Sequence, residues 1–296
     1  MPLRRCGVPR AAHSSPMSQS KQQILALLAE AGVEPRHRFG QHFMIDQNLV
    51  RAVAAAGEPK PGDLVLEVGP GTGTLTEELL GSGAEVLAVE IDRDMAALLR
   101  SRLGDRPNFS LMEADALSSK HALNAQLLAR IREALDAGRA VHLIANLPYN
   151  VASPLIVELL HAGVARLAFT VQREVAMRLR AAPGTEEYGA LSVVVQMLAR
   201  VRVLRTLPPQ AFWPAPAVES ALVRIDRQDR LGESAGAFSR FVAGLFSSRR
   251  KTLRKGLELM GYDAQAMLSA AGIDGRLRPE HLAPEELWRL FSQVAA

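Results

Sequence analysis

The stretch at residues 145–150 combines three groups that could hold a planar ring bearing an amine. It reads ANLPYN and directly follows residues 141–144, VHLI, a largely apolar run that is typical of a buried strand. The amide of Asn146 can accept a hydrogen bond, Pro148 stiffens the backbone so that nearby carbonyl groups point in fixed directions, and the ring of Tyr149 can stack on a base. The plainer interpretation is a turn, because asparagine and proline commonly end strands.

A glycine-rich loop upstream could bind a small molecule. Residues 65–74, VLEVGPGTGT, read as a strand that runs into a loop with glycine at every second position and then into a helix. Glycine lets the backbone approach a ligand closely. The spacing differs from the Gly-x-Gly-x-x-Gly loop that holds a pyrophosphate, and both Glu67 and Pro70 are poorly suited to an anionic ligand.

Three carboxylates surround this loop in the sequence. Glu90 ends the next predicted strand, 21 residues after Gly69, where a carboxylate can accept both ribose hydroxyls. Asp115 follows the third strand, where it could accept from an adenine amine, and Glu67 lies in the loop segment itself. Residues 58–94 contain nine acids and only two bases. This set favours a cationic ligand that contains adenosine, S-adenosylmethionine, over the alternatives NAD and ATP.

The basic residues gather elsewhere, although the formal net charge is only +4. Residues 166–205 contain seven bases and three acids, and a second basic run follows at residues 249–255. Such clusters suit a polyanion such as RNA, and the alternative is a solvated helix face. The predicted RNA-binding residues are Arg173, Arg178, Arg180, Arg249, Arg250, Lys251, Arg254 and Lys255.

Composition narrows the class of protein. The 296 residues are 48% hydrophobic and 22% charged, which is typical of a globular protein, and no apolar run reaches the roughly 20 residues that span a bilayer. The only cysteine is Cys6, so neither a disulfide framework nor a cysteine-bound metal is expected. We therefore predict a cytoplasmic protein without a metal. Residues 1–20 are expected to be a disordered extension, with translation from Met17 or an organelle-targeting peptide as alternatives.

The order of predicted elements indicates an α/β fold. Apolar runs predict strands at residues 64–68, 86–90, 109–112, 141–145 and 167–171, and helical patterns fall between them at 74–81, 92–103, 122–137 and 153–161. This alternation predicts a parallel sheet with helices on both faces. Two helices are expected upstream, at 21–31 and 46–56, and long strands at 191–204 and 218–226 as an antiparallel edge.

The pattern changes to helix alone near residue 230. Helices are predicted at residues 237–246, 251–260, 264–271 and 284–294. We therefore divide the chain into the extension at 1–20, a cofactor-binding catalytic domain at 21–229, and a small helical domain at 230–296 that would contact RNA.

A series of motifs occurs in one order over roughly residues 20–292. They read RFGQHFMID from residue 38, EVGPGTGTLT from 67, VEID from 89, EADAL from 113, NLPYN from 146, QREVAMRL from 172, YGALS from 188, FWPAPAVES from 212 and FSSRRKTL from 246. This order resembles the ribosomal RNA adenine N6-dimethyltransferase family, and is closest to its small-subunit branch.

The resemblance implies a fold, an activity and a set of cofactor contacts. The fold would be that of a Rossmann-like class I methyltransferase, with a mostly parallel seven-stranded sheet and an antiparallel edge. The enzyme, expected to be a monomer, would dimethylate adenines of small-subunit rRNA within a pre-mature small ribosomal subunit. The segment at 120–138 is interpreted as an inserted surface element. The implied cofactor-binding residues are His42, where the family usually has asparagine, and Met44, Gly69, Gly71, Glu90, Asp115 and Asn146.

The chemistry of this family would explain the 145–150 stretch. The exocyclic amine of adenine is a poor nucleophile and far too weak an acid to be deprotonated first. The side-chain oxygen of Asn146 and the backbone carbonyl of Leu147 or Pro148 could accept both N–H bonds and aim the nitrogen lone pair at the methyl group. Tyr149 would stack on one face of the flipped base and Phe212 on the other.

Three rival functions share parts of this pattern. A large-subunit rRNA methyltransferase of the antibiotic-resistance type would share Asn-x-Pro-Tyr, but Leu147 and the motif at 246–253 favour the small-subunit enzyme. A DNA adenine methyltransferase would share the pocket. A non-catalytic ribosome-assembly or transcription factor on the same scaffold would not require Glu90, Asp115, Asn146 and Tyr149 to be present together.

Overall fold

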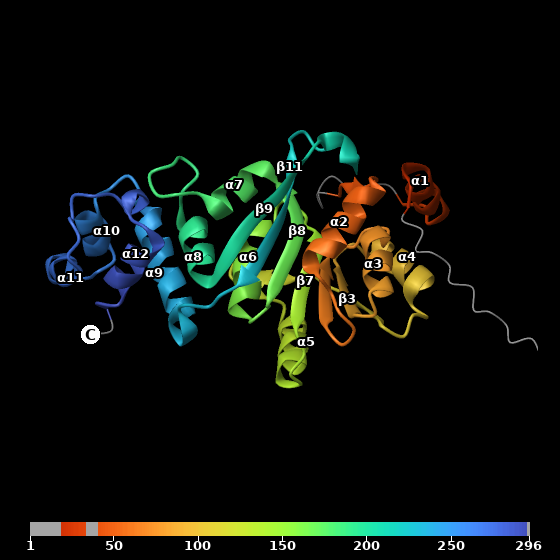
Figure 1. Ribbon diagram of the computed structural model, residues 1–296, viewed down its shortest axis with the longest axis horizontal. Helices are drawn as coiled ribbons and strands as arrows, with labels where there is room; N and C mark the ends of the chain where they lie inside the picture. Colours follow the sequence, from red (N-terminus) through yellow and green to blue (C-terminus); the bar gives the residue numbers. More distant parts are fainter. Residues whose placement is uncertain (1–18, 34–40, 295–296) are drawn as a thin grey trace, which may run out of the picture.

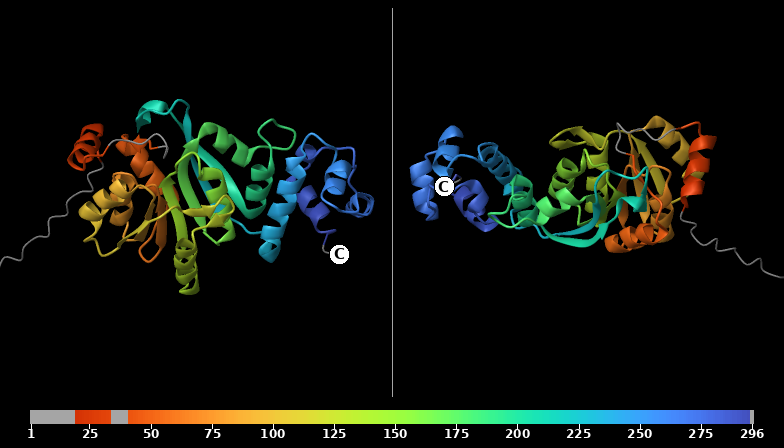
Figure 2. Two further views of the ribbon diagram at one scale, coloured as in Figure 1. Left: turned by 180° about the vertical axis from the view of Figure 1, so that it is seen from behind. Right: turned by 90° about the horizontal axis from the view of Figure 1, so that it is seen from above.

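The computed structural model describes residues 19–33 and 41–294 (Figure 1). Residues 1–18, which carry most of the predicted extension, lie outside the described residues. The described part is an elongated molecule with a central sheet, and the first helices and the last helices lie at opposite ends of it (Figures 1 and 2). Within these residues, no helix combines the length and apolar character needed to cross a membrane.

The centre is a seven-stranded sheet with the order β4-β3-β2-β7-β8-β11-β9. Strands β2, β3, β4, β7 and β8 pair in parallel, whereas β11 is antiparallel to both of its neighbours. The predicted parallel sheet with an antiparallel element at one side is confirmed. The strands are β2 Leu64–Val68, β3 Glu85–Glu90, β4 Phe109–Glu113, β7 Val141–Asn146, β8 Arg166–Gln172, β9 Ala199–Leu207 and β11 Ser220–Arg227.

Each face of the sheet packs against its own set of helices. On one face, α2 Gln47–Gly57, α3 Thr74–Gly81 and α4 Arg93–Leu103 enclose a core that includes Val65 and Ile144. On the other face, α5 Ala125–Asp136 and α6 Ala152–His161 pack over a core that includes Leu66 and Leu143. Adjacent residues of a strand point to opposite faces, so both must be apolar when both faces are covered.

The predicted strand at 191–204 is wrong in its first half. The chain forms helix α8 Ala190–Leu198 and only then strand β9. The run of Val193, Val194 and Val195 suggested a strand, but all three are buried, because α8 lies between the rest of the fold and the C-terminal helices. A short apolar run covered on most sides shows no helical period, so its pattern cannot distinguish a buried helix from a strand.

The segment at 120–138 is not an added surface element. It contains strand β6 Ala122–Leu123, which forms a small hairpin with β5 Leu117–Ser119, and helix α5. Parallel strands need a crossover connection, and α5 supplies the helix of the crossover between β4 and β7. Leu127 and Ile131 are fully buried against the sheet, which explains why this helix is amphipathic.

The C-terminal part is helical, as predicted. Helices α9 Ala235–Ser247, α10 Leu253–Leu259, α11 Ala264–Ala271 and α12 Pro284–Phe291 pack beside α8, and their apolar side chains continue one of the two sheet cores. Helix α7 Arg173–Arg180 precedes α8, and short 3-10 helices occur at Pro209–Ala211, Gly232–Ser234 and Pro279–His281. The loop between α7 and α8 reaches this helical part through Tyr188, whose hydroxyl donates to the backbone oxygen of Leu282 at 2.7 Å.

A small second sheet joins two segments that are distant in sequence. Strand β1 Phe43–Met44 pairs antiparallel with β10 Phe212–Trp213. Helix α1 Lys21–Glu30, which begins with a capping box of Ser20 and Gln23, packs through Ile24 and Leu28 in a cluster with Phe43. These contacts hold the segment around residue 42 beside the carboxyl ends of the main strands.

Candidate active site

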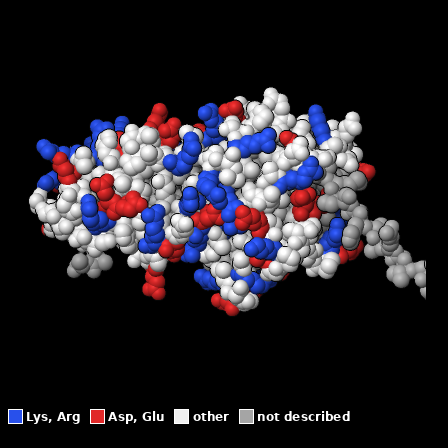
Figure 3. All heavy atoms as spheres, in the orientation of Figure 1, with Lys and Arg blue, Asp and Glu red and all other residues white. Residues whose placement is uncertain are grey.

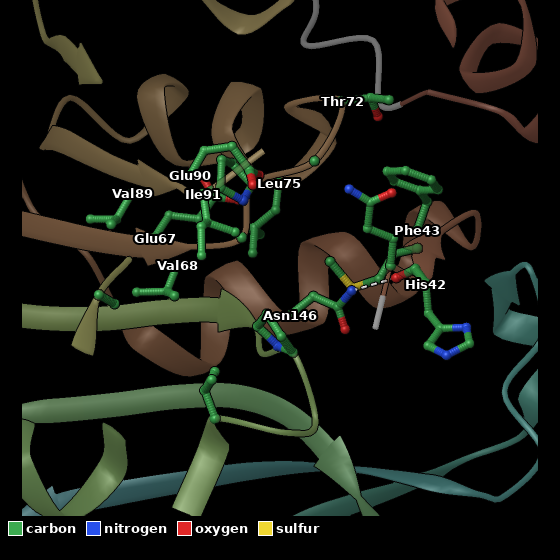
Figure 4. Close-up of a pocket in the computed structure, with 18 of the residues that line it drawn as sticks. His42, Phe43, Glu67, Val68, Thr72, Leu75, Val89, Glu90, Ile91 and Asn146 are labelled. Carbon is green, nitrogen blue, oxygen red and sulfur yellow. Dashed lines mark hydrogen bonds between the residues drawn. The ribbon is translucent and has the colours of Figure 1, made fainter. Parts of the chain in front are cut away.

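A pocket opens at the carboxyl ends of β2, β3 and β7 (Figure 4). Ligands of open α/β sheets bind in this position, because the loops that leave the strands surround it. All seven predicted cofactor-binding residues line this one pocket: His42, Met44, Gly69, Gly71, Glu90, Asp115 and Asn146.

The glycine loop after β2 allows two other segments to approach it closely. Gly69 and Gly71 have φ angles of 71° and 58°, which residues other than glycine rarely adopt. A Cβ atom on Gly69 would lie 3.1 Å from Pro148, and one on Gly71 would lie 2.8 Å from the ring of Phe43. The loop therefore packs against the NLPYN segment on one side and against β1 on the other, and larger residues would push both away.

Two of the three acidic side chains are deeply buried, near the carboxyl ends of β2 and β3. Glu67 and Glu90 are 2% and 4% exposed, and Asp115 is exposed. Burial raises the pKa of Glu67 to about 8 and the pKa of Glu90 to about 7. Glu90 Oε1 accepts from the backbone N–H of Asp92 at 2.9 Å, whereas Glu67 Oε2 has no hydrogen-bond partner among the described residues. A buried carboxyl group with an unpartnered oxygen, such as that of Glu67, suits a ligand that brings hydroxyl groups or positive charge.

Asn146 ends strand β7 with its amide held from two sides. Its Nδ2 donates to the backbone oxygen of His42 at 2.6 Å, the interaction drawn as a dashed line in Figure 4. Its Oδ1 accepts from the hydroxyl of Thr170 on the neighbouring strand β8. In the same view, Glu67 and Glu90 lie on the other side of the pocket. The amide thus faces the space between the glycine loop and the segment after β1.

The rest of the NLPYN segment is fixed by three contacts. The backbone N–H of Leu147 donates to the oxygen of Thr170 at 3.2 Å, and the carbonyl of Pro148 accepts from the N–H of Val151 at 3.3 Å. The hydroxyl of Tyr149 lies 2.7 Å from that of Ser220. The direction of the Tyr149 ring is therefore set by β11, and the backbone of the loop by β8 and the start of α6.

His42 lies against Tyr149. The two rings are stacked, with centroids 5.5 Å apart and an angle of 27° between their planes. His42 Nδ1 is 2.6 Å from the backbone oxygen of Pro214, and because a carbonyl only accepts, Nδ1 must carry the proton. The imidazole therefore covers part of one side of Tyr149, which is half-buried and, like the buried Leu147, does not line the pocket itself.

Phe212 does not line the pocket. Its side chain is 2% exposed and packs in the core between β10 and helix α2. The structure therefore does not bring it to face Tyr149, and stacking on a base would require this ring to turn out of the core. The sequence placed it correctly in a segment beside the site, because β10 pairs with β1, but could not show that its side chain points inward.

The predicted RNA-binding residues lie in two regions of the chain, and most of them are exposed. Arg173, Arg178 and Arg180 belong to α7, and the second group occupies the turn after α9 and the start of α10. Arg173 pairs with Glu219 at 3.2 Å, and both side chains are about half exposed. Arg249 is about half exposed and pairs at 3.4 Å with Glu280, which is 17% exposed. On the face in Figure 3, basic side chains occur along the whole molecule with acidic ones between them. Exposed pairs of this kind hold basic side chains loosely.

Several residues that shape the pocket carried no clear signal in the sequence. Ile91 lines it with 46% of its side chain exposed, directly after Glu90, where an apolar face can lie against a planar ring. Phe43 lines it from β1. Thr170 does not line the pocket but hydrogen-bonds to Asn146, which does. The position of Ile91 after the strand-ending carboxylate could have identified it. Among the described residues, no group of three or more potential metal ligands comes together.

The sheet order, the glycine loop and the carboxylate at the end of β3 define a Rossmann-like methyltransferase. The residues present suit the cofactor of such enzymes, since two buried carboxyl groups lie beside the loop and one oxygen of Glu67 has no hydrogen-bond partner within the described part of the chain. The chain belongs to the ribosomal RNA adenine dimethylase family, which matches residues 32–296.

Individual relatives agree with this family. The protein is 42% identical over 278 residues to a ribosomal RNA small subunit methyltransferase A of Magnetococcus marinus, covering 92% of this chain and 95% of that protein. It is 41% identical to the enzyme of the same name from Pseudomonas putida, covering 88% and 95%. Among solved structures, it resembles the 23S rRNA methyltransferase ErmE (26% identity, TM-score 0.60, 86% and 100% covered). It shares its fold with a dimethyladenosine transferase from Plasmodium falciparum (21% identity, TM-score 0.66, 86% and 98% covered).

Proposed function

We propose that this protein transfers methyl groups from S-adenosylmethionine to the N6 amines of two adjacent adenosines near the 3′ end of small-subunit rRNA. The substrate would be a late precursor of the small ribosomal subunit, and the enzyme would act as a cytoplasmic monomer. The observation that carries the proposal is the oriented amide of Asn146, which faces the same pocket as the glycine loop and Glu90.

The choice of the small subunit rests on the relatives. Proteins that are 42% and 41% identical to this chain bear a small-subunit name, whereas the 23S rRNA enzyme of similar structure is 26% identical. The alternatives of a large-subunit enzyme and of a non-catalytic factor are therefore not favoured.

The cofactor would lie along the glycine loop with its ribose at Glu90. The carboxylate of Glu90 would accept from both ribose hydroxyls, Asp115 would accept from the adenine amine, and Ile91 would cover one face of that adenine. Gly69 and Gly71 would let the methionine part approach the backbone. Glu67, whose pKa is raised to about 8 in the free protein, would offset the positive charge of the sulfonium once that charge favours its ionised form. When bound, S-adenosylmethionine supplies an electrophilic methyl group on a sulfonium.

The protein's part in the reaction would be orientation of the target amine. The free lone pair of Asn146 Oδ1 would accept one N–H bond, and a backbone carbonyl of the NLPYN segment would accept the other. This arrangement turns the nitrogen lone pair towards the methyl group. The bound cofactor would supply the methyl group and keep its sulfur as a neutral thioether, and the methylated amine, positively charged at first, would lose a proton to solvent. The acceptor oxygens stabilise that developing charge.

Tyr149 would provide a stacking surface for the flipped adenine. Its hydrogen bond to Ser220 and its contact with His42 fix the ring before the base arrives, so little side-chain entropy is lost on binding. Base–aromatic stacking contributes roughly 1–3 kcal/mol per base. The α7 arginines and the basic run at 249–255 would bind phosphates around the target.

The proposal is tested by supplying competing substrates to the same enzyme. Undermethylated small subunits, free large-subunit rRNA and duplex DNA are incubated with protein and S-adenosylmethionine, and the digested nucleosides are measured by mass spectrometry. We expect dimethyladenosine only from small-subunit rRNA. Dimethyladenosine from large-subunit rRNA, or methyladenine in the DNA with none in the small subunit, would overturn the assignment.

A further inference from the structure

The geometry points to Thr170 as a positioning residue that orients the amide of Asn146 for methyl transfer. This inference rests on the proposed role of Asn146 as an acceptor for the target amine. Thr170 lies in strand β8, outside the pocket, and is fully buried. It would therefore act through Asn146 and would touch neither the cofactor nor the base.

Strand pairing places the two residues side by side. Asn146 and Thr170 are register partners in the parallel pair β7–β8, so their side chains project from the same face of the sheet. The Thr170 hydroxyl donates to Asn146 Oδ1, and the Thr170 carbonyl accepts from the backbone N–H of Leu147 at 3.2 Å. One residue of β8 thus holds both the side-chain acceptor and the backbone of the next residue in the loop.

The hydrogen bonds leave only one arrangement of the amide. The backbone oxygen of His42 can only accept, so the nitrogen of Asn146 must be on that side and its oxygen must face Thr170. The hydroxyl of Thr170 then serves as donor. Of the two lone pairs on Asn146 Oδ1, one is occupied by Thr170 and one remains for an amine in the pocket. Without the hydroxyl, a single hydrogen bond would hold the amide, and its plane could rotate about the Cβ–Cγ bond.

The composition of β8 supports a specific role for this hydroxyl. The five inner residues of the strand are fully buried, and the other four are apolar: Leu167, Ala168, Phe169 and Val171. A hydroxyl in such surroundings is costly unless it is hydrogen-bonded, and valine would fill the same space without that requirement. Within residues 19–33 and 41–294, the Thr170 hydroxyl hydrogen-bonds to Asn146 alone.

The test compares Thr170→Val, which keeps the shape and removes the hydroxyl, with Thr170→Ser, which keeps the hydroxyl. Single-turnover methylation of undermethylated small subunits measures the chemical step, and titrations measure cofactor affinity and the RNA KM. We expect Thr170→Val to lower the rate about tenfold or more, with cofactor affinity and RNA KM within about twofold of wild type. Thr170→Ser should recover most of the rate, because the donor is restored.

Two further measurements separate this role from a purely structural one. Thr206→Val makes the same change on an exposed position of strand β9 and should leave the rate unaltered. In an Asn146→Ala background, Thr170→Val should cause no further loss, because the residue it positions is gone.

The outcomes distinguish the positioning role of Thr170 from the proposed role of Asn146 as an acceptor. If Asn146→Ala is inactive but Thr170→Val is as fast as wild type, the positioning role is wrong and the role of Asn146 stands. The same conclusion follows if Thr170→Ser is as slow as Thr170→Val, or if the two losses simply add. If Asn146→Ala is fully active, the proposed function of the amide itself fails.

Discussion

The Nδ2 atom of Asn146 lies 2.6 Å from the backbone oxygen of His42, although 104 residues separate them in the chain. This contact links the end of a central strand to the short segment that closes the cofactor pocket from the other side. Because β1 is held by its pairing with β10, the position of His42 depends on a third segment of the chain. The orientation of the proposed catalytic amide therefore depends on the assembled fold.

Replacing Asn146 by alanine should abolish most of the methyl transfer. The variant loses the acceptor for one N–H bond of the target amine, and loss of one such polar group from an active site costs about a hundredfold or more in rate. Single-turnover mass spectrometry of nucleosides measures the effect. Asn48→Ala, an exposed change on α2, is the matched control and should retain wild-type activity. Wild-type activity in Asn146→Ala would contradict the mechanism.

Alanine at Gly71 should destabilise the protein and weaken cofactor binding. The residue has φ of 58°, and its Cβ would lie 2.8 Å from the ring of Phe43. Gly138 is the matched control, since its φ of 71° imposes similar backbone strain but its Cβ would meet nothing within 4 Å. We expect Gly138→Ala to lower the free energy of unfolding by about 1 kcal/mol and Gly71→Ala by about 2–4 kcal/mol.

Denaturant titration and calorimetry of cofactor binding check this pair. Only Gly71→Ala should also lose cofactor affinity, because the displaced Phe43 lines the pocket. Equal losses of stability in the two variants would show that the contact with Phe43 is unimportant.

Cofactor affinity should rise with pH through about 7. Burial raises the pKa of Glu90 to about 7, so in the free protein this carboxyl is largely protonated below that pH. Only the carboxylate can accept from both ribose hydroxyls, so a proton must leave on binding at low pH. Affinity should then fall by about tenfold for each pH unit below the pKa.

Calorimetry in buffers of different ionisation enthalpy measures the protons released, and we expect about one at pH 6. In Glu90→Gln the affinity should be lower and the step near pH 7 should disappear. Glu67→Gln should keep that step, because the pKa of Glu67 is raised to about 8, above the pH range of the step. A wild-type affinity that stays constant between about pH 5.5 and 8 would contradict the role of Glu90.

Removing charge from the turn after α9 should weaken RNA binding without affecting the cofactor. Arg250 and Lys251 are exposed, and Arg250→Ala or Lys251→Ala should each reduce the salt dependence of binding by nearly one counterion if each side chain contacts a phosphate. Filter binding to small subunits at several salt concentrations gives this slope. Arg276→Ala removes an exposed arginine of the same helical region that pairs with Asp274, and serves as the control. If the salt dependence of binding has the same slope in all three variants, this turn does not contact the RNA.

The sequence by itself determined the alternation of strands and helices between residues 64 and 171 and several of the residues that line the pocket. Three local patterns mark the site: the strand, glycine loop and helix at 65–74, the carboxylate that ends the next strand, and the motif at 146–150. The carboxyl ends of parallel strands necessarily meet at one edge of the sheet. For this reason Glu90, Asp115 and Asn146 could be assigned to one site before the fold was known, whereas His42 was implied only by the family resemblance. The family resemblance extended this assignment to the activity.

Only the tertiary structure decided which side chains are accessible and how they are held. In the structure Phe212 is buried, residues 190–198 form a helix, α5 is part of a crossover connection, and Thr170 lies against Asn146. Each outcome depends on contacts between segments that are distant in the chain: β10 with β1, α8 with α9, and β8 with β7. Local propensity and periodicity contain no information on such neighbours, because the burial of a side chain is fixed only when the packed layers come together.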